Sequence, residues 1–432
     1  MTTVRAEEML AVSDALARIL SHFQTLPPEP IQTPNALGRV LAEDVRAQHD
    51  VPPFANSAMD GYAVRAQDVR DASQAHPVEL PVVDDIPAGA SPKKTVEPGT
   101  AARIMTGAPM PPGADAIVPV EDTDEQWHQA GRETLPAPGR IAIYQPTGPN
   151  RYVRPAGEDL AAGEVALARG TLLRPQELGV LASIGAVEIT VFQRPKVAIF
   201  STGDELLPIE AKITPGKIRD VNGHTLSNLV RTHGGIPLWL GIVPDHPDEV
   251  RTRLQSALDQ GADVILSSAG VSVGAFDVVT NVLTEFGQIN FWRVRMRPGK
   301  PLAFGLVKNV PFFGLPGNPV SAMVSYDVFA RPAILKLGGR PWQIQTVPVV
   351  LGETLRSDGR ESYLRVEVSR QNDQWVARSV GGQGSNLLTS MVRANALVII
   401  PEGVKEARAG ETYPARLIDS GIPLPPHDPT LD

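Results

Sequence analysis

The stretch Lys196-Val-Ala-Ile-Phe-Ser-Thr-Gly-Asp-Glu205 sets the architecture of this chain. Its Val-Ala-Ile-Phe run predicts a buried β-strand, and its Ser-Thr-Gly-Asp-Glu half ends that strand in a polar loop. The same alternation continues to Leu337. Further strands are predicted over 236–243, 264–267, 289–295, 301–306 and 310–314, and helices from a cap at Asn222 to Gly234 and over 247–260, 278–286 and 319–337. This alternation predicts a mostly parallel α/β sheet covered by helices.

Polar, glycine-rich segments follow several of these strands. Three of them combine Gly or Pro backbone with hydroxyls, a carboxylate or a cation, as a site for a phosphate-bearing ligand and a metal requires. They are Ser268-Ala-Gly-Val-Ser-Val-Gly-Ala-Phe-Asp277, Arg297-Pro-Gly-Lys-Pro301 and Gly314-Leu-Pro-Gly-Asn-Pro-Val-Ser321. Ligands of open α/β sheets bind beyond the carboxyl ends of the strands. We therefore expect the first and last of these motifs to share one edge with 201–205 and 241–245, which favours an enzyme acting on a small molecule.

Composition limits the function further. A chain of 432 residues is too long for one core and predicts three or four domains. The net charge of −8 argues against non-specific nucleic-acid binding, and cations gather only locally, at Arg293, Arg295, Arg297 and Lys300. Without cysteine, a bound cation must use oxygen or imidazole donors. The acidic N-terminus and the lack of a long apolar run predict a cytoplasmic protein without a membrane partner.

The flanking regions have a different pattern. Apolar residues at helical spacing predict one amphipathic helix over 6–23. Short apolar runs broken by Pro and Gly predict a β-rich module from about 46 to 150, and Val-rich runs after Arg340-Pro341 predict a small β-barrel or sandwich. The expected fold class is therefore multidomain α/β plus β.

Seven short motifs, taken together and in order, identify a family resemblance. They are Asn56-Ser-Ala-Met-Asp-Gly-Tyr-Ala63, Arg103-Ile-Met-Thr-Gly-Ala108, Gly157-Glu-Asp159, Ser201-Thr-Gly-Asp-Glu-Leu206, Gly270-Val-Ser-Val-Gly274, Arg297-Pro-Gly-Lys-Pro301 and Leu315-Pro-Gly-Asn-Pro-Val-Ser321. In this order the chain resembles the molybdopterin molybdenumtransferase family, both the bacterial MoeA type and the E domain of gephyrin. The resemblance covers nearly the whole chain.

The resemblance implies insertion of molybdate into adenylylated molybdopterin, with release of AMP and with Mg²⁺ as the assisting cation. The substrate offers a pyrophosphate and an anionic sulfur pair, and molybdate is itself a dianion. Cations and aligned N–H donors must therefore gather three negative groups, while carboxylates hold the metal that offsets their charge.

The resemblance also assigns residues to roles. The implied catalytic set is Asp60, Thr106, Asp159, Glu205, Asp245 and Asp277, of which Glu205, Asp245 and Asp277 are the expected metal ligands. The implied substrate-binding set is Ser272, Arg297, Lys300, Pro316, Pro319, Ser321, Arg365 and Ser385. We expect no serine nucleophile, because oxyanion binding by hydroxyls and cations needs no covalent step.

Several of these residues have simpler interpretations from residue type alone. Asp245 and Asp277 could cap helices, and Asp60 could close a turn before Gly61. Arg365 could be a strand residue that projects to solvent, and Ser385 could belong to a turn.

The chain departs from the commoner text of the family in three places. Arg297 stands where lysine is frequent, so arginine keeps the charge there and adds a planar guanidinium. Arg295 stands where a small residue is frequent. Ala269 replaces a usual glycine, and Ala275-Phe276 replaces a more polar pair before Asp277.

The resemblance implies four domains and a homodimer. The expected domains are 1–45 with 151–194, the inserted module 46–150, the α/β unit 195–337 and the C-terminal unit 341–425. In the implied dimer, Asp60 and Thr106 of one subunit face the α/β edge of the other. A molybdopterin adenylyltransferase and molybdoenzymes are the expected handover partners.

Two other functions remain open. Adenylylation of molybdopterin is one, because enzymes of that step resemble the 195–337 unit, although they usually consist of that unit alone. A non-catalytic, gephyrin-like scaffold is the other, although the chain lacks the extra trimer-forming domain of such a lattice.

Overall fold

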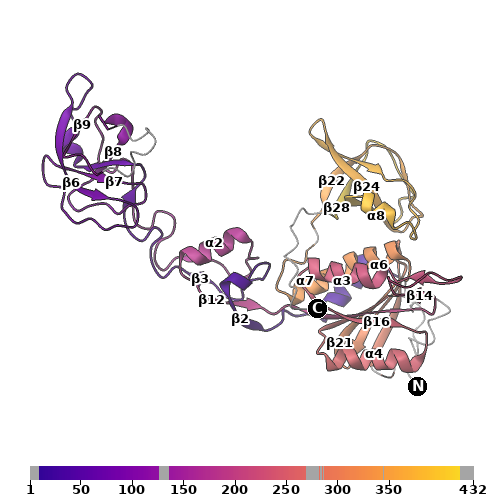
Figure 1. The fold of residues 1–432 in the computed structure, drawn as a ribbon. Coiled ribbons are helices and arrows are strands. Elements are labelled where there is room, and N and C mark those ends of the chain that lie inside the picture. Colours follow the sequence, from indigo (N-terminus) through magenta and orange to yellow (C-terminus); the bar gives the residue numbers. More distant parts are fainter. Residues whose placement is uncertain are drawn as a thin grey trace.

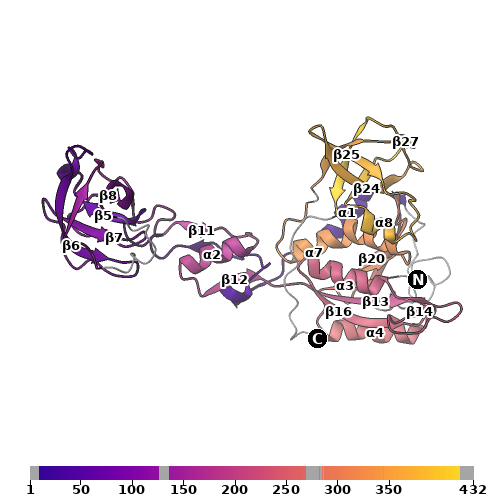
Figure 2. The same cartoon turned by 45° about the horizontal axis from the view of Figure 1, so that its top comes forward.

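The computed structural model describes residues 9–125, 136–268, 282, 285, 287–343 and 345–418. The chain forms an elongated molecule with a body at one end and an arm that projects from it (Figures 1 and 2). The body consists of an α/β domain and a C-terminal barrel beside it. The arm consists of a small middle unit around α2 and a β-rich module at its tip.

A seven-stranded, mostly parallel sheet forms the centre of the body, as predicted. Strand β20 runs antiparallel to its two neighbours, and the other six strands share one direction. Across the sheet the strands are β1 (Met9–Leu10), β18 (Gly287–Val294), β20 (Pro301–Val307), β21 (Val310–Leu315), β17 (Val264–Ser268), β13 (Lys196–Thr202) and β16 (Ile236–Val243).

Helices cover both faces of this sheet, because alternate strand residues point to opposite sides. Val197 and Ile199 of β13 belong to one buried cluster, which also contains side chains from four helical segments, and Ala198 and Phe200 belong to a second cluster under α4 (Pro247–Asp259). The helical segments of the first cluster are α1 (Val12–Leu20), α3 (Asn222–Thr232), α6 (Pro319–Ser325) and α7 (Arg331–Leu337), the last two joined by a π-helical turn, η4 (Tyr326–Ala330).

The N-terminal segment differs from the prediction. The helix begins only at Val12, and Met9–Leu10 form a strand that pairs with β18. Ala15, Ile19 and Phe23 are buried in the α/β core, where the Phe23 and Phe313 ring centroids lie 6.1 Å apart. This helix therefore packs with the body and not with the elongated unit to which the first 45 residues were assigned. The reason is that the apolar face of the helix and the apolar face of the sheet bury each other.

The arm is built from two segments far apart in the sequence. Its middle unit pairs strands from before and after the inserted module and contains one helix. The elements are β2 (Pro28–Gln32), η1 (Thr33–Asn35), β3 (Val45–Arg46), β11 (Val165–Leu167), α2 (Pro175–Ser183) and β12 (Glu188–Phe192).

The module at the tip is β-rich, as predicted. The chain enters and leaves it through the paired strands β4 (Asn56–Ser57) and β10 (Val153–Arg154). Its five-stranded sheet has the order β8 (Ala116–Pro119), β5 (Gly61–Val64), β7 (Ala101–Ile104), β6 (Val78–Ile86) and β9 (Arg140–Ile143), with short turns η2 (Ala66–Val69) and η3 (Val120–Asp122).

The C-terminal unit is a closed barrel, which confirms the predicted β-barrel. Closure follows because β24 pairs with both β25 and β26. The barrel strands are β22 (Val347–Leu351), β24 (Glu361–Gln371), β25 (Gln374–Ser379), β26 (Ala396–Ile400) and β28 (Thr412–Leu417). The remaining short elements are β14 (Leu206–Leu207), β15 (Ile218–Arg219), β19 (Met296–Arg297), β23 (Leu355–Arg356), β27 (Glu406–Ala407) and α8 (Thr389–Arg393). None of the helices in the described part of the chain is both long and apolar enough to cross a bilayer.

Candidate functional site

The carboxyl ends of the parallel strands meet along one edge of the sheet, which we call the rim. The register pairs Thr202 with Val243, and Ser268 with both Ser201 and Leu315, so these four strands end side by side. Because β20 runs in the opposite direction, its first residue, Pro301, lies at the same edge. The rim therefore brings together 203–205, 244–245, 295–300 and 316–318.

Charge changes sign along this rim. Asp245 follows β16 and Glu205 follows β13, whereas Lys300 precedes β20 and Arg297 follows β18. Four strand spacings separate β16 from β20, which amounts to about 19 Å. The rim thus has an acidic end and a basic end.

The acidic end holds three carboxylates. The Asp245 amide donates to Asp204 Oδ1 over 3.3 Å, and the Glu205 carboxylate folds against Gly203, where a Cβ would lie 2.6 Å from Glu205 Oε2. Burial, followed by the charges of Asp204 and Glu205, raises the pKa of Asp245. The ionised form of Asp245 is therefore disfavoured until a cation offsets the negative charge.

The helix-cap interpretation of Asp245 is wrong. The residue before α4 is His246, and no side chain caps this helix. Within the described residues, no group of three acidic or imidazole side chains is arranged to hold a metal. The third predicted ligand, Asp277, lies outside the described residues, as do Ser272 and the variant positions Ala269, Ala275 and Phe276. The oxygen-only donors that are present, Glu205 and Asp245, suit a hard cation such as Mg²⁺.

The basic end is formed jointly by the α/β domain and the barrel. Arg365 of β24 is fully buried, and its Nη2 donates to the carbonyls of Gly382 and Gly384 over 3.3 and 3.2 Å. Its Nε and Nη1 have no hydrogen-bond partner among the described residues. Arg365 therefore does not project to solvent, and the interpretation as a surface strand residue is wrong.

Arg297 lies near Arg365. Strand β19 pairs with the start of β24, with Arg297 opposite Ser362. Burial, and then the charge of Arg297, lowers the pKa of Arg365. No carboxylate of the described chain forms an ion pair with either guanidinium, whereas the nearby Arg295 pairs with Glu402 over 2.7 Å. Arg297 and Arg365 are therefore a cationic pair with no ion-pair partner among the described residues. Asp358, which pairs with Arg360, also senses the charge of Arg297, and its pKa is lowered by both.

The other predicted binding residues surround this pair. Pro319 begins α6, Ser321 in its first turn is 5% exposed, and the Val320 amide donates to the Ser385 carbonyl over 3.1 Å. The barrel loop that carries Ser385 thus covers the N-terminus of α6. Pro316 is buried at the end of β21, and Lys300 is exposed at the start of β20.

Sequence reasoning missed a buried polar cluster behind the rim. Asn222 does not cap α3 as predicted: its amide donates to Ser268 Oγ over 2.6 Å and to the Gly317 carbonyl over 2.8 Å. Asp220 accepts instead from the Gly223 amide and from Ser201 Oγ, over 3.1 and 3.0 Å. The sequence offers one signal for this cluster, the polar Asn222 just before Gly223 at a helix start. Its partners, Ser268 and Gly317, are distant in sequence and could not be identified from it.

The remaining predicted residues lie in the arm, away from the rim of the same chain (Figure 1). Asp60 does more than close its own turn, because its Oδ1 accepts from the Thr106 amide and hydroxyl over 2.6 and 2.7 Å. Asp159 is exposed near the base of the module, where its amide donates to the Val51 carbonyl. Within one chain, the predicted residues of the rim therefore lie together, whereas the Asp60–Thr106 pair lies away from them in the arm.

Comparison with known proteins places the chain in a family. Three family descriptions match in succession: "MoeA N-terminal region (domain I and II)" over residues 10–185, "Probable molybdopterin binding domain" over 198–336 and "MoeA C-terminal region (domain IV)" over 348–417. A molybdopterin molybdenumtransferase of Nostoc is 39% identical, over 85% of this chain and 84% of its own length. The chain belongs to the molybdopterin molybdenumtransferase family.

Other relatives extend the match. The molybdopterin molybdenumtransferase of Haemophilus influenzae is 35% identical over 94% of this chain and 97% of its own length. A crystal structure of the molybdopterin biosynthesis protein MoeA from Pyrococcus horikoshii aligns with a TM-score of 0.78 at 32% identity, and the alignment covers 96% of this chain and 100% of that one. Arm, body and barrel are therefore all part of the architecture shared by this family.

Proposed function

We propose that this protein inserts molybdate into adenylylated molybdopterin, with release of AMP and formation of the molybdenum cofactor, in a reaction that requires Mg²⁺. The observation that carries the proposal is the rim, with carboxylates at one end and, at the other, an Arg297–Arg365 pair that forms no ion pair among the described residues. A substrate that combines a pyrophosphate, a sulfur pair and an incoming oxyanion needs both ends at once.

The basic end is the proposed molybdate site. Two guanidinium groups offer fixed, planar sets of N–H donors to a tetrahedral dianion, and Nε and Nη1 of Arg365 donate to no other group in the described part of the chain. Ser321, Ser385 and Lys300 add hydroxyl and ammonium donors around the anion. In this role Ser321 binds and orients the oxyanion and forms no covalent bond.

The acidic end is the proposed Mg²⁺ site. Glu205 and Asp245, with Asp277, would hold the cation, and bound Mg²⁺ would supply positive charge next to the phosphates. The raised pKa of Asp245 supports the fit, because a cation relieves the repulsion that disfavours its ionised form.

The complete site is proposed to form between two copies of the chain. Asp60 and Thr106 form a specific hydrogen-bonded pair at the tip of the arm, yet the arm extends away from its own rim (Figure 2). A homodimer with the arm of one subunit against the rim of the other would bring both sets of residues to one substrate.

The function is tested by incubating the purified chain with adenylylated molybdopterin, Mg²⁺ and molybdate, and measuring AMP and active cofactor. AMP release that depends on molybdate supports the proposal. Release of pyrophosphate from ATP in the presence of molybdopterin would identify the adenylylation step instead. A folded chain inactive in both assays would favour the scaffold.

A further inference from the structure

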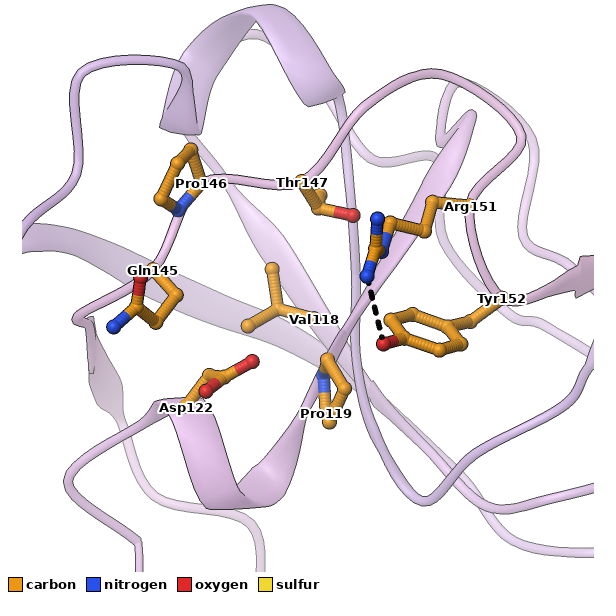
Figure 3. Close-up of a pocket in the computed structure, with 8 residues that line it drawn as sticks. All are labelled: Val118, Pro119, Asp122, Gln145, Pro146, Thr147, Arg151 and Tyr152. Carbon is orange, nitrogen blue, oxygen red and sulfur yellow. Dashed lines mark hydrogen bonds between the residues drawn. The ribbon is translucent and has the colours of Figure 1, made fainter.

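A cavity of about 280 Å³ opens in the tip module (Figure 3). Its floor contains Val118 and Pro119 at the end of β8. Figure 3 shows Asp122 and Gln145 on one side of the cavity and Arg151 and Tyr152 on the other. The volume lies at the small end of the range for ligand sites, so it suits a ring system and not a whole dinucleotide-sized substrate.

The polar groups of this cavity are not used by the protein itself. Within the described residues, no hydrogen bond or ion pair involves the Asp122 carboxylate or the Gln145 amide. Among the described residues, the Arg151 guanidinium forms a hydrogen bond and a cation–π contact only with Tyr152: Nη2 donates to the hydroxyl over 3.2 Å, and Cζ lies 5.0 Å from the ring centroid. A carboxylate and a guanidinium thus face one cavity without pairing with each other, and a planar ligand with donors next to an acceptor on one edge could use Asp122 and Gln145 while it packs against the Arg151–Tyr152 wall.

The backbone of the cavity wall is held in an uncommon conformation. Asn150 and Tyr152 have φ values of 60° and 58°, which place both residues in the left-handed region. This region is unfavourable for a residue as large as tyrosine, and such strain persists where the surroundings enforce it. The Asn150 amide donates to the Asp115 carbonyl and the Ala58 amide to the Tyr152 carbonyl, over 2.7 and 2.8 Å.

These bonds also place the cavity next to the Asp60–Thr106 pair. The Ala58 amide connects the Tyr152 wall to the turn that contains Asp60. On the other wall, the Val120 amide donates to the Asp60 carbonyl over 3.0 Å, and Val120 begins the short η3 turn that carries Asp122. Both walls are therefore fixed to the segment 58–60.

We propose that this cavity binds the pterin ring of the substrate. The 2-amino-4-oxopyrimidine edge of a pterin has two N–H donors and an adjacent carbonyl acceptor. The donors match the Asp122 carboxylate and the adjacent carbonyl matches the Gln145 amide on the same side of the cavity, while the ring can pack against Val118 and against the opposite wall of Arg151 and Tyr152. The inference rests on the proposed function and extends it: the arm of one subunit holds the pterin end while the rim of the other holds the phosphates and molybdate.

The test titrates full-length protein with pterin itself, 2-amino-4-oxopteridine, and follows the fluorescence of the ring. Lumazine, which has a carbonyl in place of the 2-amino group, is the matched ligand. Wild type is expected to bind pterin roughly tenfold more tightly than lumazine. With lumazine bound, the Asp122 carboxylate would face a carbonyl oxygen in place of the amino group that donates to it in pterin. Asp122→Asn should abolish this preference, and Arg151→Ala should weaken the binding of both ligands.

Arg140→Ala is the matched control, because Arg140 lies in the same module and, among the described residues, its side chain forms only an exposed ion pair with Glu79. It should bind both ligands as wild type does. Equal affinity of wild type for pterin and lumazine, or unchanged pterin binding by Asp122→Asn, would overturn the inference.

Molybdate-dependent AMP release in the same preparations separates this inference from the proposed function. A raised KM for adenylylated molybdopterin in Asp122→Asn supports the cavity as part of the site. Normal AMP release with an unchanged KM in that variant would show that the cavity is not part of the substrate site, while the proposed function would stand. Selective pterin binding without any AMP release would contradict the proposed function but support the cavity as a pterin site.

Discussion

Asn222 donates its side-chain amide to the carbonyl oxygen of Gly317 over 2.8 Å, which joins the start of α3 to the loop before α6. The same amide group donates to Ser268 Oγ, at the end of β17. One buried side chain behind the rim therefore ties the start of α3 and the end of β17 to the 316–318 loop of the rim, and its two amide bonds go to none of the predicted ligands of molybdate.

Replacing Asn222 with leucine should loosen the rim. The change leaves the buried Ser268 hydroxyl and the Gly317 carbonyl without their donor, which lowers the free energy of unfolding by about 1–3 kcal/mol. Hydrogen exchange at the amides of Gly317, Asn318 and Val320 should accelerate. Asn228→Ala, on the same helix, removes an exposed bond to the His224 carbonyl and should do neither. Unchanged exchange in Asn222→Leu would show that the loop is held by other contacts.

Arg365→Met should separate binding from stability. Arg365 is buried with two nitrogens unpaired, so removing its charge should leave the protein as stable as wild type or more stable. Molybdate affinity, measured by calorimetric titration, should fall by at least about tenfold. Arg365→Lys keeps the charge but loses the planar fork, and should be intermediate. Arg370→Ala, exposed on the same strand, should bind molybdate normally.

Asp245 should make stability depend on pH in a defined direction. Its folded-state pKa is raised by burial and by neighbouring carboxylates, from an ordinary value of 3.8. Below that value Asp245 is neutral in both folded and unfolded chains, and its contribution to stability is fully present. The contribution is lost as pH rises through the raised pKa.

The melting temperature of Asp245→Asn should therefore exceed that of wild type near neutral pH and match it in acid. Added Mg²⁺ should raise the melting temperature of wild type more than that of the variant. Glu249→Gln, exposed in the first turn of α4, is the control. A lower melting temperature of Asp245→Asn at neutral pH would contradict the assignment of Asp245 to an uncompensated acidic cluster.

Two inactive variants should restore each other if the site is shared between subunits. Asp60→Asn and Lys300→Ala change the arm and the rim, and each alone should lose most AMP release. After subunit exchange, a mixed dimer contains one site with both residues intact, so activity should return to a fraction of wild type. A mixture as inactive as its components, with exchange confirmed by mass, would place both residues in one chain's own site.

The sequence predicted what depends on local pattern. The strands and their carboxyl ends follow from apolar runs and the turns that stop them, so the positions of Glu205, Asp245 and Lys300 at one edge could be anticipated. The burial of Arg365 and the bonds of Asn222 could not. Both depend on packing between segments distant in sequence, and residue type alone favours the surface for an arginine and the helix cap for an asparagine.

The most direct test of the account measures AMP released from adenylylated molybdopterin as molybdate concentration rises, for wild type, Lys300→Ala and Lys308→Ala. The two lysines lie at opposite ends of β20, so only Lys300 belongs to the rim. We predict that release depends on molybdate, that Lys300→Ala requires at least about tenfold more of it, and that Lys308→Ala behaves as wild type. AMP release that is independent of molybdate, or equal responses of the two variants, would contradict the account.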